Sequence, residues 1–389
     1  MSGLGRDWPA GTATNWPYEV SGGGPPPSNG RAFPTYEDVM DHIPQHHLVS
    51  YPGSYPSYSN TGIGVLGLAL AAASSAADGN DTVITHAELL QRDIFGPMGL
   101  NGSHFLATSG NKYSIVVSSV LPEVVDDDFR NAMNPSGGQF STLSDFITLA
   151  QTLLNPRHPK SQITQYSMNR WLQQVHAFEE DDWTEMGFLW EIIKAPDSNG
   201  RLRRVYMKLG NLPGFHTAVA IHPGTSYGVT LLLAGSYSDS AGLVSDAFEI
   251  MQPGIDKGLS DLAQELYAGH WVDVDPLHNS TEPSSARISV HKGTMYIDEF
   301  TLLGVDALEK LETKGRVALR STRRDEFRLD VGVPPLNGKR SSACTPYWVM
   351  LDNWGLRNNA PINAIYFTGS NADRRLHVPS LSLVMKRAE

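Results

Sequence analysis

The stretch YMKLGNLPGFHTAVAIHP, residues 206–223, contains the end of one predicted β-strand and the whole of the next. A further strand-like run follows it after Pro223-Gly224-Thr225-Ser226, a sequence that favours a hairpin turn. The sequence therefore predicts an antiparallel sheet whose strands cover residues 187–194, 202–209, 215–222 and 227–234.

Predicted helices come before this sheet. An Ala- and Leu-rich run over residues 63–77 is typical of a buried helix. The segment from Thr85 to Glu88 forms a capping box that begins the next helix, LLQRDIF. We expect Gly96-Pro97 to end that helix.

A second capping box runs from Thr142 to Asp145 and begins a helix at FITLAQTLL. Two more helices are expected after the sheet, over residues 241–251 and 259–267. Helices, then an antiparallel sheet, then helices predict an α+β fold with layered packing.

The two ends of the chain have different compositions. Residues 1–35 are dense in Gly and Pro, which indicates a long surface loop. From about His270 onward, short alternating runs separated by turns indicate a small barrel or sandwich, and YWVML is one of these runs. We therefore predict one domain over residues 1–268 and an all-β, barrel-like domain over 269–389.

Charge and hydropathy exclude several classes of partner. The 389 residues carry a formal net charge of −11, whereas binding to phosphates needs a clustered basic surface. The basic stretch from Arg316 to Arg328 is interrupted by Asp325 and Glu326, so we interpret it as a solvated face. No run of about 18 apolar residues is evident. We therefore expect no nucleic-acid partner and no membrane span.

Metal and redox chemistry are also disfavoured. Cys344 is the single cysteine, which excludes a disulfide framework and a thiolate metal cluster. His42, His46 and His47 lack a His-Glu-x-x-His pattern, and Pro44 between them makes a poor platform for metal ligands. We expect no metal and no cofactor.

Four segments, in order along the chain, resemble the serine β-lactamase and penicillin-binding-protein superfamily, in particular its class C-like fungal branch. They are PSYSNTGIGVLGLAL (56–70), IFGPMGLNGSHF (94–105), NPSGGQFSTLSDFITLAQTLLN (134–155) and YMKLGNLPGFHTAVAIHP (206–223). The resemblance implies a β-lactamase/transpeptidase-like antiparallel sheet flanked by helices. The tail resembles the β-barrel appendage of many fungal members.

The resemblance also implies a site. Tyr58 would be the tyrosine of the family's Tyr-x-Asn motif, and Lys208 would be the lysine of its Lys/His-x-Gly strand. An ordinary tyrosine has a pKa of about 10 and becomes a useful base only where cations stabilise the phenolate. Asn60 would orient a substrate amide or ester, and Gly210 would let the strand backbone approach the ligand. His216, on the next strand, would be a further substrate contact.

One departure from the family pattern affects the nucleophile. The family places its Ser-x-x-Lys segment upstream of Tyr-x-Asn, before a turn that Met1-Ser2-Gly3-Leu4 resembles. We therefore expect the chain to be an N-terminally truncated member that begins after the nucleophile. The segment from Ser109 to Lys112 has the Ser-x-x-Lys spacing, but it follows Tyr58 in a polar loop, and we interpret it as a chance match.

Two functions remain open at this point. The resemblance favours a serine-hydrolase or acyl-transferase type of protein that acts on an ester, lactone or amide of a small molecule, in natural-product metabolism. The alternative is a catalytically dead or non-covalent relative that binds a small molecule or partner in the remnant cleft. Structural roles for Tyr58, Lys208 and His216 also stay open. Because truncation would leave apolar core surface uncovered, we expect self-association into a homo-oligomer, or cover from residues 1–35.

Overall fold

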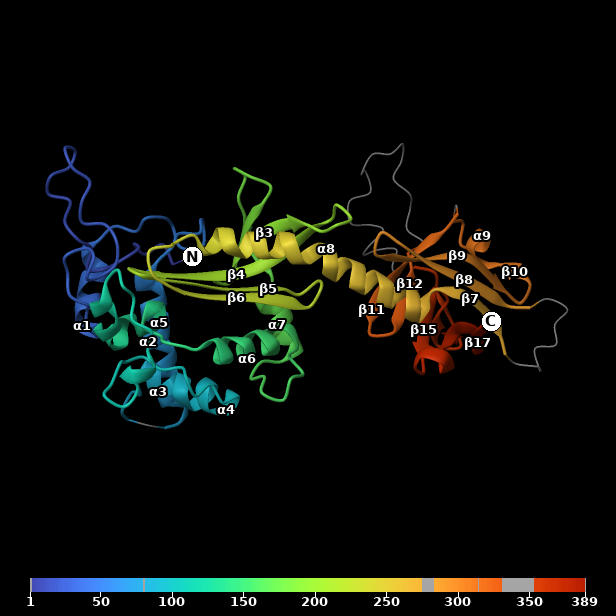
Figure 1. Ribbon diagram of the computed structural model, residues 1–389, viewed down its shortest axis with the longest axis horizontal. Coiled ribbons are helices and arrows are strands. Elements are labelled where there is room, and N and C mark those ends of the chain that lie inside the picture. The colour runs from blue at the N-terminus through green and yellow to red at the C-terminus, as the bar shows by residue number, and fades with distance from the viewer. Residues whose placement is uncertain (1, 80, 275–282, 314, 331–352, 389) are drawn as a thin grey trace. The chain divides into compact units, whose positions relative to one another are not determined.

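The computed structural model describes residues 2–79, 81–274, 283–313, 315–330 and 353–388. The chain folds into two compact units, each with its own core (Figure 1). The first unit comprises Met1–Pro196 and Arg201–Ile250, and the second comprises Asp197–Gly200 and Met251–Glu389. The domain boundary that the sequence places near residue 268 stays a prediction.

A six-stranded antiparallel sheet lies at the centre of the first unit, with its strands in chain order. They are β1 (Gln174–Ala177), β2 (Thr184–Gly187), β3 (Glu191–Pro196), β4 (Leu202–Leu212), β5 (Phe215–His222) and β6 (Tyr227–Ala234). The predictions for β5 and β6 are confirmed. The predicted strand 187–194 is only partly right: β3 begins at Glu191, because Gly187 ends β2 and the chain turns through Leu189, which has a φ of 66°.

The sheet has two apolar faces, because successive side chains along a strand point in opposite directions. On one face, Ala218 and Ala220 pack against Val244 and Phe248 of helix α8 (Ser240–Tyr267). On the other face, a second cluster packs against helices α6 (Leu143–Leu154) and α7 (Gln165–Trp171), and its sheet residues include Ile192, Tyr206 and Ile221. Figure 1 shows α8 and α6 on opposite sides of the strands. The expected α+β layering is confirmed.

Helix α8 corrects the prediction of two helices after the sheet. It is continuous from Ser240 to Tyr267, and Pro253 lies inside it. Proline removes one backbone hydrogen bond from a helix interior and normally kinks or ends the helix. Apolar residues of α8 nevertheless pack on both sides of the proline: Val244 and Phe248 before it are buried, and Ala263 and Tyr267 after it are partly buried. This packing stabilises both halves of the helix.

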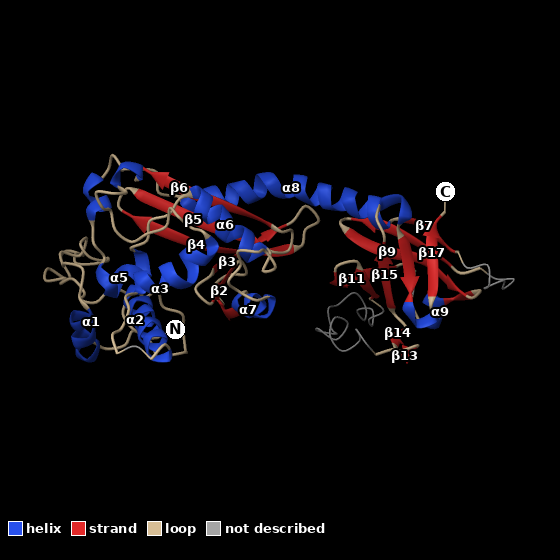
Figure 2. Ribbon diagram, turned by 90° about the horizontal axis from the view of Figure 1, so that it is seen from below, coloured by secondary structure: helices blue, strands red, loops and turns tan. Residues whose placement is uncertain are grey.

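Helices α2 (Asn60–Ala77), α3 (His86–Leu90) and α5 (Arg130–Gly137) pack together in the first unit (Figure 2). Two glycines of α2 allow the close approach to α5. A Cβ atom would lie 2.3 Å from the Ala132 carbonyl oxygen at Gly64, and 2.2 Å from Cγ of Pro135 at Gly67. Any larger residue at either position would push the two helices apart.

The expectation that residues 63–77 form a buried helix is only partly right. One side of α2 is buried, but Leu66 and Leu70 on another side are 47% and 52% exposed. Among the described residues, α2 is also the one helix long and apolar enough to cross a membrane, with 33% of it buried. Core helices of soluble proteins share this length and apolar composition.

The capping box at Thr85 and Glu88 is confirmed, with both reciprocal hydrogen bonds present. The predicted end of the helix at Gly96-Pro97 is wrong. A π-helical turn (Gln91–Phe95) and a short helix α4 (Gly96–Met98) continue it to Gly99, which has a φ of 67°. Proline is accommodated in the first turn of α4, where its missing N–H needs no partner.

The Thr142 side of the second capping box is confirmed, because its Oγ1 accepts a hydrogen bond from the Asp145 backbone N–H at 3.3 Å. The Asp145 side chain has a different role. It is 7% exposed and accepts hydrogen bonds from Gly102 N–H at 2.9 Å and from Ser103 Oγ at 2.8 Å. Asp145 therefore attaches the loop around Ser103 to the start of α6.

The second unit contains a closed antiparallel barrel. Among the residues that the structure describes, its sheet has nine strands in the order β10-β9-β11-β12-β15-β16-β17-β7-β8, and a pairing between β8 and β9 closes the ring. The expectation of a small all-β domain is confirmed as a barrel. The strands are β7 (Gly269–Asp273), β8 (Ser285–His291), β9 (Thr294–Leu302), β10 (Val305–Asp306), β11 (Val317–Arg323), β12 (Glu326–Leu329), β15 (Ala364–Thr368), β16 (Arg375–Val378) and β17 (Leu383–Arg387).

Side chains fill the barrel interior. Trp271, Ile297, Ile365, Leu376 and Met385 are all at 0% exposure and belong to one continuous core. Each fully buried side chain of this size contributes roughly 1.5–3 kcal/mol. The barrel is therefore a packed core rather than a ligand cavity. The predicted strand YWVML lies outside the described residues.

Candidate functional site

Tyr58 and Lys208 come from distant parts of the sequence and lie side by side in the first unit. Tyr58 precedes Ser59, the N-cap of α2, and Lys208 is near the middle of β4. The Lys208 Nζ lies over the Tyr58 ring, 5.5 Å from its centroid. Tyr58 is 53% exposed, so a ligand can reach its ring. The structure thus brings together the two residues that the sequence singles out for acid–base chemistry.

A second cation, which the sequence did not indicate, also lies over this ring. The Arg6 Cζ is 4.9 Å from the Tyr58 ring centroid. The N-terminal segment that carries Arg6 is attached to the start of α2 by three hydrogen bonds. Ser59 Oγ donates to the Gly5 carbonyl at 2.7 Å, Thr61 N–H to the Arg6 carbonyl at 3.2 Å, and Trp8 N–H to Thr61 Oγ1 at 2.8 Å.

Asn60 faces a protein carboxylate. Its side chain is 9% exposed, and its Nδ2 donates to Asp7 Oδ1 at 2.7 Å. Asp7 is itself 5% exposed, and its other oxygen lies 3.4 Å from Arg6 Nε. In this structure Asn60 therefore holds Asp7, and Asp7 pairs with Arg6. The substrate-orienting role that the resemblance implies for Asn60 stays a prediction.

Lys208 is engaged in two polar contacts besides its approach to Tyr58. Its Nζ donates to Glu191 Oε1 at 2.7 Å and to the Leu209 carbonyl at 2.8 Å. The Lys208 side chain is 39% exposed and that of Glu191 is 31% exposed. Both side chains of this pair are partly exposed to solvent, and an exposed ion pair stabilises the protein by at most about 1 kcal/mol. Lys208 is therefore held in place without being sealed from a ligand.

Gly210 lies on the same face of the sheet as Lys208, two residues further along β4. It pairs with Thr217 of β5, and a Cβ atom at Gly210 would lie 2.5 Å from Thr217 Oγ1. A side chain at this position would displace Thr217. The glycine thus keeps the two strands close at the position where the resemblance places ligand contact.

His216 does not join these residues. In the register of β4 and β5 it pairs with Asn211, whereas Lys208 pairs with Val219. Positions 208 and 211 on β4 differ by an odd number, so their side chains point to opposite faces of the sheet. His216 is therefore on the face that α8 covers further along, and its Nδ1 is 2.9 Å from Asn211 Oδ1.

Two Ser-x-x-Lys segments occur in the chain, and neither lies on an α-helix. Ser109 is in a turn, and Lys112 begins a short 3₁₀ helix and pairs with Asp126. The second segment, overlooked in the sequence, has Ser289 in strand β8 and Lys292 in the turn after it. A serine and a lysine three residues apart meet only on a helix, where they share one face. These segments therefore do not have the geometry of the family's nucleophile.

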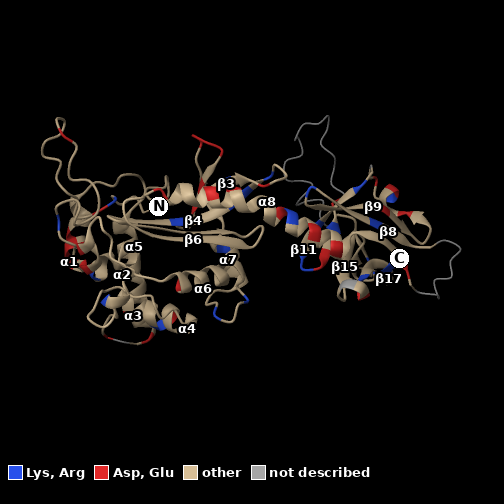
Figure 3. Cartoon of the chain, in the orientation of Figure 1, with Lys and Arg blue, Asp and Glu red and all other residues tan. Residues whose placement is uncertain are grey.

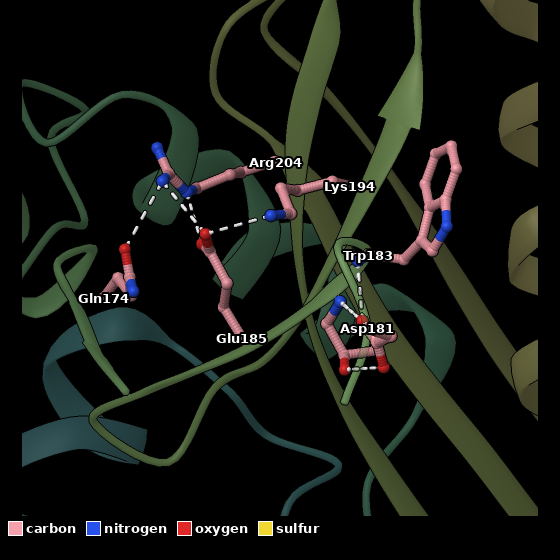
Figure 4. Close-up of polar contacts among 7 residues, drawn as sticks. Gln174, Asp181, Trp183, Glu185, Lys194 and Arg204 are labelled. Carbon is pink, nitrogen blue, oxygen red and sulfur yellow. Dashed lines mark hydrogen bonds and ion pairs between the residues drawn. The ribbon is translucent and has the colours of Figure 1, made fainter. Parts of the chain in front are cut away.

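The charged side chains of the sheet come from β2, β3 and β4, because β5 and β6 carry no Lys, Arg, Asp or Glu (Figure 3). Besides the Lys208 pair, Arg204 of β4 and Lys194 of β3 cluster around Glu185 of β2. Arg204 Nε lies 2.5 Å from Glu185 Oε2, and Lys194 Nζ lies 3.5 Å from its Oε1. Figure 4 shows Arg204 and Lys194 pointing toward the Glu185 carboxylate.

The Glu185 cluster is a structural feature rather than a second reactive site. Glu185 is 5% exposed, and the hydrogen bond from Arg204 is the largest cause that lowers the pKa of its carboxyl. The same hydrogen bond raises the pKa of Arg204. A carboxylate with two cationic partners is a poor proton donor or acceptor near neutral pH. Its role is to tie β2, β3 and β4 together.

Other features of the first unit are less suited to chemistry. A cavity of about 320 Å³ lies between α6 and β6, and its lining is mostly apolar: Leu143, Ile147, Ala150, Gln151, Leu154, Gly228 and Thr230. No titratable side chain is among them. Within the described ranges, no group of three or more His, Cys, Asp or Glu could hold a metal ion. The residues around Tyr58 are therefore the best candidate site.

Known proteins resemble this chain over most of its length. Residues 2–248 match the family described as Beta-lactamase. The "Beta-lactamase-like protein str6" of Strobilurus tenacellus is 39% identical over 310 residues, which are 77% of this chain and 98% of that protein. A "Beta-lactamase-like protein" of Arthroderma benhamiae is 26% identical over 220 residues, 54% of this chain and 33% of its own length.

Among solved structures, a Beta-lactamase/D-alanine Carboxypeptidase from Yersinia pestis is similar, with 21% identity and a TM-score of 0.47. The match covers 61% of this chain and 65% of that one, slightly less than two thirds of its length. The family match covers more than half of the sequence, and str6 matches over nearly its whole length. The chain belongs to the beta-lactamase family, within the superfamily of beta-lactamase-like serine hydrolases.

Proposed function

We propose that this protein catalyses acyl transfer, by hydrolysis or transesterification, on an ester, lactone or amide of a small molecule. Water or an acceptor alcohol attacks the acyl carbon, and the Tyr58 phenolate takes the proton of that nucleophile and returns it to the leaving alkoxide or amine. Lys208 is the cation that stabilises negative charge on the phenol. The observation that carries this proposal is the position of the Lys208 ammonium over the ring of a half-exposed tyrosine. General acid–base catalysis of this kind typically contributes 10²- to 10⁴-fold in rate.

The surroundings of the pair support a reactive role. Tyr58 Oη has no protein hydrogen-bond partner among the described residues, so its hydroxyl is available to a ligand. Its ring is held by Arg6 and Lys208, and its backbone leads into Ser59, the N-cap of α2. A positioned phenol with two adjacent cations is suited to the developing charge of an acyl-transfer transition state. Relatives in two fungi are consistent with a natural-product substrate, which we include in the proposal.

A second candidate function is favoured by a different observation. Lys208 pairs with Glu191, and Asn60 pairs with Asp7, so one expected catalytic group and one expected substrate-binding group already have protein partners. A site with such internal partners is also suited to binding a small molecule without converting it. In that case Tyr58 contributes one hydrogen bond, worth about 1 kcal/mol.

Tyr58→Phe separates the two functions. The substitution removes the hydroxyl and keeps the ring that packs against Arg6 and Lys208. Tyr55→Phe is the matched control, because Tyr55 lies in the same loop and its ring packs edge-on against His176 at 5.2 Å. Both variants and the parent are assayed with p-nitrophenyl esters, a δ-lactone and a chromogenic β-lactam.

For an acyl-transfer enzyme we expect Tyr58→Phe to lower kcat at least about 100-fold and Tyr55→Phe to leave it within about twofold. A parent protein that turns over none of these compounds, yet binds one of them with an affinity that Tyr58→Phe changes by about 1 kcal/mol, would favour the binding function. Equal turnover by Tyr58→Phe and the parent would refute the assignment of Tyr58.

A further inference from the structure

We infer that Arg6 determines substrate specificity at the Tyr58 site by binding a carboxylate on the ligand. This inference rests on the proposed function only for the location of the reacting group. Arg6 belongs to none of the four segments that resemble the family, and the structure alone places it over the Tyr58 ring, with its Cζ 4.9 Å from the centroid.

Arg6 is held in this position by a buried pair. Asn60 Nδ2 donates to Asp7 Oδ1 at 2.7 Å, and both residues are at least nine-tenths buried. The second oxygen of Asp7 lies 3.4 Å from Arg6 Nε. This second oxygen is buried and makes no hydrogen bond within the described part of the chain, so the ion pair with Arg6 is the contact that offsets its charge. The guanidinium lies over the Tyr58 ring while its side chain stays open to solvent.

The outer part of the guanidinium remains available. The Arg6 side chain is 62% exposed, and its contact with Asp7 uses Nε alone. Its two Nη groups have no hydrogen-bond partner among the described residues. These groups present a planar set of donors that matches the two oxygens of a carboxylate. The Tyr58 ring carries its own hydroxyl, and the Lys208 ammonium lies over the same ring. Both groups add hydrogen-bond donors to this surface.

Glu191 reduces the net positive charge around Tyr58. Its carboxylate is 31% exposed and lies 2.7 Å from Lys208 Nζ, so it offsets part of the positive charge near Tyr58. A singly charged, planar anion fits one guanidinium and a partly neutralised lysine. A phosphate dianion is attracted more strongly by Arg6 and Lys208 and also repelled more strongly by Glu191, and it is tetrahedral rather than planar. We therefore choose the carboxylate because its planar shape matches the guanidinium.

Calorimetric titration of the full chain with three probes tests this inference. The probes are phenylacetylglycine, which carries a carboxylate, its neutral primary amide, and phenyl phosphate. The variants are Arg6→Gln, Arg6→Lys and Glu191→Gln. Arg31→Gln is the control, because Arg31 also lies in the N-terminal segment and its side chain contacts Thr12 instead of Tyr58.

We expect Arg6→Gln to weaken binding of phenylacetylglycine about tenfold or more and to leave the amide within about twofold. Arg6→Lys restores part of that loss. Glu191→Gln has the opposite effect and strengthens binding of the carboxylate roughly three- to tenfold, because it removes the negative charge beside Lys208. Arg31→Gln changes neither affinity.

Equal binding of phenylacetylglycine by Arg6→Gln and the parent would overturn the inference, as would an equal loss for the acid and the amide. Tighter binding of phenyl phosphate than of phenylacetylglycine, lost in Arg6→Gln, would overturn the choice of carboxylate. These titrations need no turnover. Their failure therefore refutes the role of Arg6, whereas unchanged turnover in Tyr58→Phe refutes the proposed function.

Discussion

Glu185→Gln tests the role of the charged cluster on the sheet. The substitution keeps the size of the side chain and removes its negative charge, so Arg204 and Lys194 lose their common partner. Glu185 is 5% exposed, and loss of one member of a fully buried ion pair costs about 3–5 kcal/mol.

The cations in this cluster are less buried than the carboxylate. The Arg204 side chain is 47% exposed and that of Lys194 is 21% exposed, so water can solvate both after the substitution. Discounting for this screening, we expect Glu185→Gln to lower the free energy of unfolding by about 1–3 kcal/mol. Hydrogen exchange should show the loss of protection in β2, β3 and β4.

The same cluster predicts a dependence on pH. The pKa of Glu185 is lowered in the folded state from its ordinary value of 4.5, chiefly by the hydrogen bond from Arg204. The unfolded chain therefore binds a proton first as the pH falls. The stabilisation from Glu185 is fully present above about pH 4.5 and is lost as the pH falls through the folded pKa.

Urea denaturation of the parent, Glu185→Gln and Glu180→Gln at several pH values measures both effects. Glu180 is the control, because it is an exposed glutamate in the loop before β2. Below about pH 4.5 the difference between the parent and Glu185→Gln should shrink. The reasoning is refuted if Glu185→Gln is as stable as Glu180→Gln at neutral pH, or if the difference is the same across the acid range.

Three further predictions concern other parts of the first unit. Asp145→Asn should lower the free energy of unfolding by about 1–2 kcal/mol, measured by urea denaturation, because Asp145 accepts buried hydrogen bonds from the loop at Ser103; a loss no larger than that of Ser144→Ala would contradict it. The parent should self-associate in sedimentation experiments, and Leu70→Gln on α2 with Leu232→Lys on β6 should reduce this, because both leucines are exposed and β6 is an uncharged edge strand; a parent that is monomeric at high concentration would count against it. A serine-directed fluorophosphonate should give no stoichiometric adduct by intact-mass spectrometry, and an adduct mapped to Ser109 would overturn our view of that segment.

Much of the fold could be predicted from local patterns. The boundaries of β5 and β6 were right because a hairpin turn separates two apolar runs. The prediction of two separate helices over 241–251 and 259–267 was wrong, because tertiary packing on both sides of Pro253 is not visible in the local sequence. The same reason explains the continuation of the chain through Gly96-Pro97 into a helical turn.

The candidate site could be predicted only in part. Tyr58 and Lys208 were found through motifs, and the structure places them together. Arg6 and Glu191 carry no motif, and their position depends on how distant segments pack. The face on which His216 lies depends on the register of β4 with β5, which the length of the turn between them determines.

A double-mutant cycle on Tyr58 and Lys208 tests the central claim most directly. The parent, Tyr58→Phe, Lys208→Met and the double variant are compared by kcat/KM on the best ester or lactone substrate. If the phenol and the ammonium act as a unit, each single variant should lose about 100-fold, and the double variant should lose little more than that. Independent contributions, with a loss of about 10⁴-fold in the double variant, or no loss in any variant, would contradict the account.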